Sequence, residues 1–195
     1  MSAVGSVLTR AGLRVSEERF AALVEAALAE IGGPGAGDPG ATLAAGDVAA
    51  LTAVGADLAP RRSREADPRA ATAAAYAGLL ADSRSVAEVA GDLGIDTSRV
   101  RHRLADRGLI GIRRSGGWLL PAYQFDAAGR PLPGLERVVR ALPDGLHPVV
   151  TARFFATAVP ELRLGRRRVT PREWLAAGGD PAPVAALAAT LDLLP

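Results

Sequence analysis

The segment Ser85–Tyr123, SVAEVAGDLGIDTSRVRHRLADRGLIGIRRSGGWLLPAY, decides the fold of this chain. It predicts a helix, a tight turn, a second helix and a two-stranded hairpin. Ser85, followed three residues later by Glu88, is the capping-box pattern that begins a helix. Gly94 is suited to the left-handed residue that ends one. The apolar stripe of this first helix comprises Val86, Val89, Ala90 and Leu93.

The second predicted helix carries the basic residues of the segment. Asp96, Thr97 or Ser98 can cap it, Val100 and Leu104 form its inner face, and Gly108 is expected to end it. Its outer face comprises Arg99, Arg101, His102, Arg103 and Arg107. We expect Leu109, Ile110 and Ile112 to form a short strand, residues 113–117 a turn, and Trp118–Leu120 the returning strand.

This order of elements is typical of a helix-turn-helix with a wing, whose second helix enters the major groove of DNA. Between Thr97 and Trp118 there are six arginines and a single acid, Asp106. Arginine suits both guanine edges and phosphates. The alternative is an ordinary helical pair with a solvated basic face. The residues that we predict to contact DNA are Thr97, Ser98, Arg99, Arg101, His102, Arg103, Arg107, Arg113 and Arg114.

Residues 1–82 form a predicted helical N-terminal region with a candidate role in dimerisation. Ser16–Ile31 has an amphipathic pattern, residues 32–45 read as a Gly/Pro linker, and a second helix is expected over Gly46–Leu58. Asp67-Pro68 predicts the start of a helix that runs to about Ala81. We expect that helix to bury Ala71, Ala74, Ala75, Gly78 and Leu79.

Residues 133–195 form a predicted C-terminal helical domain, separate from a DNA-binding domain over residues 83–126. A stripe from Leu135 to Leu142 predicts one helix, and His147-Pro148 begins the next, with His147 as a capping or surface residue. Thr170-Pro-Arg-Glu173 is a second capping box. Asp180-Pro181 starts the last helix, after Gly178-Gly179, so that Trp174 lies at a sharp corner.

This corner carries a family resemblance. Residues 168–184, RVTPREWLAAGGDPAPV, resemble the toxin-binding domain of the Xre/MbcA/ParS antitoxins, and the whole chain is similar to actinobacterial DNA-binding proteins with a central helix-turn-helix ahead of such a domain. The resemblance implies pairing with a RES-domain toxin that degrades NAD. The positions that match the family pattern, and that it implies for toxin binding, are Pro171, Trp174, Leu175, Gly178, Gly179, Asp180 and Val184.

The composition of the chain argues against several other classes of protein. Hydrophobic residues make up 49% of the 195 residues and aromatic residues only 4%, which favours helices over a sheet sandwich. Without cysteine, and with His102 and His147 far apart, neither a disulfide nor a metal centre is expected, and we expect no cofactor. No signal peptide or membrane span is evident, so a cytoplasmic protein, nucleoid-associated when bound to DNA, is expected. The sequence lacks a phosphate loop or a nucleophile–base motif, so we expect no enzyme.

These observations predict a mostly α protein with a helical N-terminal region, a central winged helix-turn-helix and a C-terminal toxin-binding-like domain. The leading functional hypothesis is a homodimeric antitoxin that binds double-stranded DNA, represses its own operon and neutralises a RES-type toxin. The alternative is a stand-alone helix-turn-helix transcriptional regulator without a toxin partner.

Overall fold

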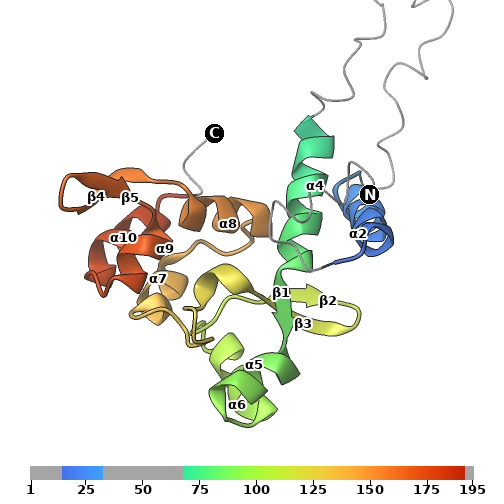
Figure 1. Ribbon diagram of the computed structural model, residues 1–195, viewed down its shortest axis with the longest axis horizontal. Helices are drawn as coiled ribbons and strands as arrows, with labels where there is room; N and C mark the ends of the chain where they lie inside the picture. The colour runs from blue at the N-terminus through green and yellow to red at the C-terminus, as the bar shows by residue number, and fades with distance from the viewer. Residues whose placement is uncertain (1–14, 33–67, 192–195) are drawn as a thin grey trace, which may run out of the picture.

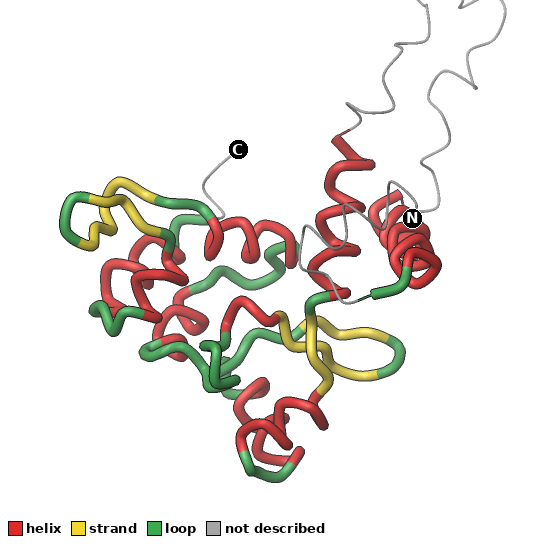
Figure 2. Tube along the Cα trace, viewed as in Figure 1, coloured by secondary structure: helices red, strands yellow, loops and turns green. Residues whose placement is uncertain are grey.

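The computed structural model describes residues 15–32 and 68–191. The chain is mostly helical with small antiparallel sheets, as predicted (Figures 1 and 2). The predicted linker beyond residue 32 and the predicted helix over Gly46–Leu58 lie outside the described residues. None of the helices in the described ranges is both long and apolar enough to span a lipid bilayer.

Two helices form the N-terminal part of the described chain. α2 (Glu17–Gly32) packs against α4 (Pro68–Ala81), and the two lie side by side in Figure 1. The start of α4 is as predicted, but the predicted inner face is only partly right, because Gly78 and Leu79 are half-buried and the three predicted alanines are not. The buried residues of α4 are Ala73, Tyr76, Ala77 and Leu80, while Ala71, Ala74 and Ala75 are exposed. Because alanine fills every side of this helix, the larger Tyr76 and Leu80 decide which face turns inward.

The helix-turn-helix consists of α5 (Val86–Leu93) and α6 (Thr97–Ala105). Both halves of the predicted capping box are present, since the Ser85 hydroxyl accepts from the Glu88 amide and the Glu88 carboxylate accepts from the Ser85 amide. Gly94 adopts the left-handed conformation, with a φ of 61°. α6 ends earlier than predicted, at Ala105, and the left-handed residue after it is Arg107, not Gly108.

The predicted hairpin belongs to a three-stranded sheet of order β1-β3-β2. β2 (Ile112–Arg114) pairs with β3 (Gly117–Pro121), so Arg113 and Arg114 lie in a strand and not in the predicted turn. Leu109 and Ile110, which were predicted to open the strand, precede it. β1 (Ser83–Ser85) pairs with the other edge of β3 and was not predicted. It joins α4 directly to α5 through the sheet.

The C-terminal half follows a 3-10 turn, η2 (Ala122–Gln124). It contains α7 (Leu135–Ala141), α8 (Pro148–Ala156), α9 (Pro171–Ala176) and α10 (Pro181–Ala188). Between α8 and α9 lies an unpredicted hairpin of β4 (Val159–Leu164) and β5 (Arg167–Val169). One continuous core joins this half to the helix-turn-helix, because Val89 and Val100 belong to the same buried cluster as Phe155 and Leu175.

Candidate nucleic-acid interface

The turn between α5 and α6 sets the angle at which α6 leaves the body. The amide of Gly94 donates to the carbonyl of Gly91, and that of Ile95 to Ala90, at 3.2 and 3.0 Å. Ile95 then packs against the main core. Asp96 takes the N-cap position of α6 in an extended conformation, although its side chain makes no capping hydrogen bond. Closed in this way, the turn holds α6 at a fixed angle to α5.

α6 is attached to the body by one narrow apolar stripe. Val100 is fully buried and Leu104 is partly buried against the core. Thr97 is half-buried, whereas the remaining predicted contact residues of the helix, Ser98, Arg99, Arg101, His102 and Arg103, are all exposed. At 100° per residue, Ser98 and His102 lie opposite the stripe. Arg99 and Arg103 lie on one flank and Arg101 on the other.

The arginines of α6 have no partners within the described part of the chain. Arg99, Arg101 and Arg103 make no side-chain hydrogen bond or ion pair there. His102 differs, because its Nε2 lies 3.3 Å from a carboxylate oxygen of Asp106. Arg99 lies in the first helical turn, where the helix dipole disfavours a cation, and a like charge four residues later at Arg103 adds repulsion. This arrangement costs the isolated protein energy, and a bound anion would offset that cost.

Arg107 was predicted to face DNA, and the structure gives its guanidinium a different position. It donates to Asp144 Oδ1 at 2.9 Å, to the carbonyl of Val139 at 3.2 Å and to the carbonyl of Leu142. These carbonyls lie at the C-terminal end of α7, where the helix dipole favours a cation. Arg107 therefore joins the helix-turn-helix to the C-terminal half.

The two wing arginines are placed differently from each other. Arg113 is exposed, and its guanidinium carbon lies 5.2 Å from the ring centre of Trp118, its cross-strand partner. Arg114 is half-buried and lies over the ring of Tyr76 on α4, at 6.0 Å. Of the two wing arginines, Arg113 is thus the exposed one.

Several polar residues that hold this unit together were not predicted from the sequence. Gln124 is fully buried, and its amide accepts from the amide of Ile110 and donates to the carbonyl of Ile110, both at 2.8 Å. Arg84 on β1 lies 4.2 Å from the ring centre of Phe125 and pairs with Asp92. Arg172 on α9 donates to the carbonyls of Tyr123 and Phe125 at 3.1 and 3.3 Å. Gln124 stands alone among the apolar residues that precede Phe125. This isolated polar residue is the signal in the sequence from which a buried hydrogen-bonding role could have been predicted.

The residues of the C-terminal motif divide between the interior and the surface, with Trp174 and Gly179 half-buried. Leu175 and Val184 are fully buried, and Pro171 is buried. The indole N–H of Trp174 donates to the carbonyl of Asp180 at 2.8 Å, and the Asp180 carboxylate accepts from the amide of Ala182 to cap α10.

Two glycines complete this corner. Gly178 has a φ of 78°, a conformation that suits glycine. A Cβ atom at Gly179 would collide with the Trp174 ring. The residues of this motif that remain exposed are Gly178 and Asp180.

No family model matches this chain, and no curated protein matches it. Among solved structures, it is similar to the NMR structure of Rv2175c, at 26% sequence identity and a TM-score of 0.43, over 56% of this chain and 80% of that chain.

Proposed function

We propose that this chain is a sequence-specific regulator that binds double-stranded DNA by inserting α6 into the major groove. The observation that carries the proposal is the face of α6. Arg99, Arg101 and Arg103 are exposed and unpaired within the described residues, on a helix fixed to the core by the fully buried Val100. The proposal is one of binding and not of catalysis.

In this proposal the residues of the α6 face have different roles. Ser98 and His102 are central and would approach base edges. Arg99 and Arg103 on one flank and Arg101 on the other would contact phosphates or guanine edges. Arg113 on the wing would contact the adjacent backbone. Arg107 and Arg114, which contact α7 carbonyls and Tyr76, are left out of this interface.

The number and spacing of half-sites in the operator depend on whether the protein binds as a dimer. If the protein is a homodimer with one α6 per subunit, its operator consists of two half-sites separated by about 10 base pairs or a multiple of that spacing. Footprinting with the purified protein measures this spacing. A single unrepeated half-site would contradict the dimeric form of the proposal.

Mobility shifts on the DNA upstream of the gene test the proposal. The variant R99A/R101A/R103A should lose the specific shift, since each lost base contact weakens binding by about 1–3 kcal/mol. The matched control R19A/R137A/R153A removes the same charge from exposed arginines elsewhere and should retain it. Equal shifts by both variants and the wild type would refute the assignment of α6.

A narrower form of the proposal is an autorepressing antitoxin that neutralises a RES-type toxin. The support for it is the resemblance of residues 168–184 to the antitoxin domain. In this form, the exposed side of the corner around Gly178 and Asp180 would contact the toxin, while Pro171, Trp174, Leu175 and Val184 would maintain its shape.

Co-expression with the neighbouring genes, followed by purification of the tagged chain, tests this narrower form. A stoichiometric partner that is lost in D180A, but retained in the control R137A, would support it. If promoter DNA is shifted and no partner co-purifies, the chain is a stand-alone regulator.

A further inference from the structure

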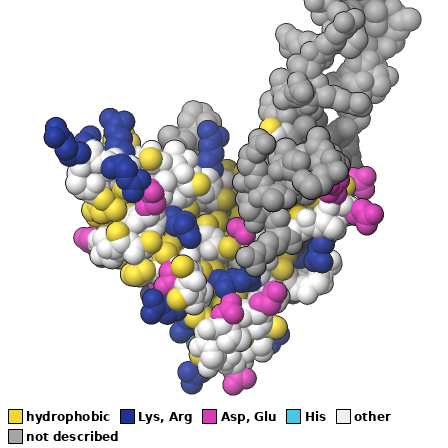
Figure 3. Space-filling view, viewed as in Figure 1, with side chains coloured by type: hydrophobic (Ala, Val, Ile, Leu, Met, Phe, Trp, Pro, Cys, Tyr) yellow, Lys and Arg dark blue, Asp and Glu magenta, His cyan; other side chains and the backbone are white. Residues whose placement is uncertain are grey.

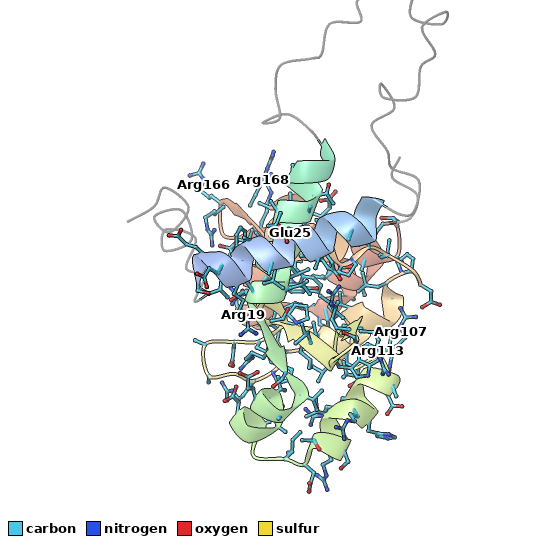
Figure 4. All side chains as sticks on the ribbon, turned by 90° about the vertical axis from the view of Figure 1, so that its right-hand side faces the viewer. Arg19, Glu25, Arg107, Arg113, Arg166 and Arg168 are labelled. Carbon is cyan, nitrogen blue, oxygen red and sulfur yellow. The ribbon has the colours of Figure 1, made fainter. Side chains whose placement is uncertain are left out.

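The β4–β5 hairpin carries a second group of arginines, far from α6. Arg163, Arg166 and Arg168 are all exposed, and we name them the hairpin arginine face. In Figure 3 the basic side chains gather over this hairpin at the upper left. Figures 1 and 4 both place the hairpin at the end of the molecule away from α6, and Arg166 and Arg168 are far from Arg107 and Arg113 in Figure 4.

The two sides of the hairpin differ in what they contact. Leu162 and Val169 are fully buried and hold the hairpin on the core. Arg167 forms an ion pair with Glu173 of α9, at 2.9 Å. Because side chains alternate along a strand, Arg163 and Arg168 lie on the outer side, where they are direct cross-strand partners. Arg166 lies at the turn between the strands.

The fold does not explain this arrangement. Like charges directly opposite each other destabilise a sheet, and no acid in the described ranges pairs with Arg163, Arg166 or Arg168. A charged residue on an edge strand prevents pairing with the edge of another sheet. A single charge of either sign is enough for that role, so it does not account for a group of arginines. Arg163 Nε donates to the carbonyl of Pro160 at 3.4 Å, whereas the guanidinium groups of Arg166 and Arg168 have no hydrogen-bond or ion-pair partner among the described residues. The donors that remain free on this face point to an anionic ligand.

The chemistry of the face favours phosphate over an acidic protein. Guanidinium groups bind phosphate oxygens in a bidentate manner. Protein interfaces depend on buried aromatic or aliphatic anchors at their centre, and the outer side of this hairpin has none. Leu164, which is 37% exposed, is the cross-strand partner of Arg167. It lies on the inner side of the hairpin and not on the side that carries Arg163 and Arg168.

We propose that the hairpin arginine face binds the phosphate backbone of double-stranded DNA without sequence preference. The DNA that it contacts is a different stretch of duplex from the one held by α6, because the two faces lie at separate corners of the molecule. This second site goes beyond the proposed reading of an operator. It would allow one chain to hold two DNA segments, or to hold non-operator DNA during a search.

The test measures binding of the full chain to a duplex of arbitrary sequence over a range of NaCl concentrations. Each phosphate contact contributes about 0.9 to the slope of log K against log salt. In R163A/R166A/R168A the magnitude of this slope should fall by about 2 to 3. The variant with lysine at the same positions should retain most of the slope, and R19A/R137A/R153A should retain all of it.

The melting temperature of the hairpin variants distinguishes a loss of binding from a loss of folding. Because the Arg163–Arg168 pair is repulsive, its removal should leave the melting temperature unchanged or raise it. The double variant R166A/R168A, which leaves β4 intact, should show a slope lower by about 1 to 2.

Several outcomes would overturn the proposal. These are a wild-type slope in the alanine variants, an equal loss in the charge-matched control, or competition by polyglutamate as strong as that by DNA. The result is independent of α6. If R99A/R101A/R103A still shifts the promoter, the proposed operator reading fails, while the hairpin result stands on its own.

Discussion

α6 and the segment 168–184 both carry distinctive sequence patterns, and the two differ in where those residues lie. On α6 the distinctive residues are exposed arginines, and only Val100 is fully buried. In the segment 168–184, Pro171, Leu175 and Val184 are buried and Trp174 closes the corner. A basic pattern on a helix thus marks a surface available to a ligand, whereas the Trp-Leu and Gly-Gly pattern marks the shape of a corner.

Arginines in the same protein also differ by location. Arg107, Arg140 and Arg172 donate to backbone carbonyls across the junction between the helix-turn-helix and the C-terminal half. Those of α6 make no such contacts within the described residues. The difference shows that composition alone does not identify a binding face. An arginine has a structural role here when free backbone carbonyls at the end of a neighbouring helix or turn lie within reach of its guanidinium group.

The largest effect is expected in the segment 168–184. Leu175 is fully buried, so L175A should lower the free energy of unfolding by about 2–5 kcal/mol through lost burial and a cavity. L164A, at a position that is 37% exposed, is the control and should change it by less than about 0.5 kcal/mol. Urea unfolding measures both. Equal stability of the two variants would contradict the structural role of the motif.

The junction should show the next largest effect. R107A removes hydrogen bonds to Asp144, Val139 and Leu142 and should lower stability by about 1–3 kcal/mol. Arg107 also has a φ of 55°, so R107G should be more stable than R107A by about 1 kcal/mol, because glycine tolerates that conformation. Thermal unfolding gives the order. If R107A is as stable as the wild type but loses specific DNA binding, Arg107 contacts DNA and does not have the structural role assigned to it.

Single α6 variants should separate binding from stability. R101A or R103A should weaken specific DNA binding by about 1–3 kcal/mol if the residue reads a base edge. Either should change the free energy of unfolding by less than about 0.5 kcal/mol, since these side chains are exposed. A loss that is equal on all DNA sequences, with a flatter salt dependence, would instead assign a phosphate contact. Fluorescence anisotropy with operator and scrambled duplexes distinguishes the two results.

A smaller effect is expected at the corner. W174F keeps an aromatic ring but loses the hydrogen bond to the Asp180 carbonyl, and should cost about 0.5–1.5 kcal/mol. W174A should cost more because it also leaves space beside Gly179. If both variants unfold like the wild type while partner binding is lost, Trp174 is a contact residue.

The smallest effect is a dependence on acid pH. The backbone amide of Thr170 and then the Arg167 guanidinium hold the pKa of Glu173 below its ordinary value. The pKa of Glu88 is likewise lowered by its hydrogen bonds with Ser85. A lowered pKa in the folded state contributes stability above the ordinary glutamate pKa, and that stability is lost as the pH falls through the folded value. E173Q should therefore show a weaker loss of stability than the wild type on acidification, measured by unfolding from pH 6 to pH 3. An unchanged acid dependence would contradict the capping role.

The parts of the fold that depend on local signals could be predicted from the sequence. Both capping boxes, at Ser85 and Thr170, and the left-handed Gly94 lie as predicted. β1 was missed because Ser83-Arg-Ser85 has no apolar pattern, and it becomes a strand only by pairing with β3. The β4–β5 hairpin was missed because a run of arginines reads as a solvated loop.

The inner face of α4 and the contacts of Arg107 depend on partners that are distant in sequence. An alanine-rich helix has no dominant apolar face until a partner contacts it, and Arg107 reads like its basic neighbours until α7 is placed beside it. Of the candidate site, the exposed face of α6 could be predicted, because its residues follow the helical period opposite Val100.

Protection of guanine N7 in the major groove from methylation, measured on the upstream DNA, tests the role of α6 in its simplest form. The wild type should protect guanines in each half-site, and R99A/R101A/R103A should lose that protection, while R19A/R137A/R153A keeps it. Protection that is unchanged in the α6 variant would show that another surface reads the DNA.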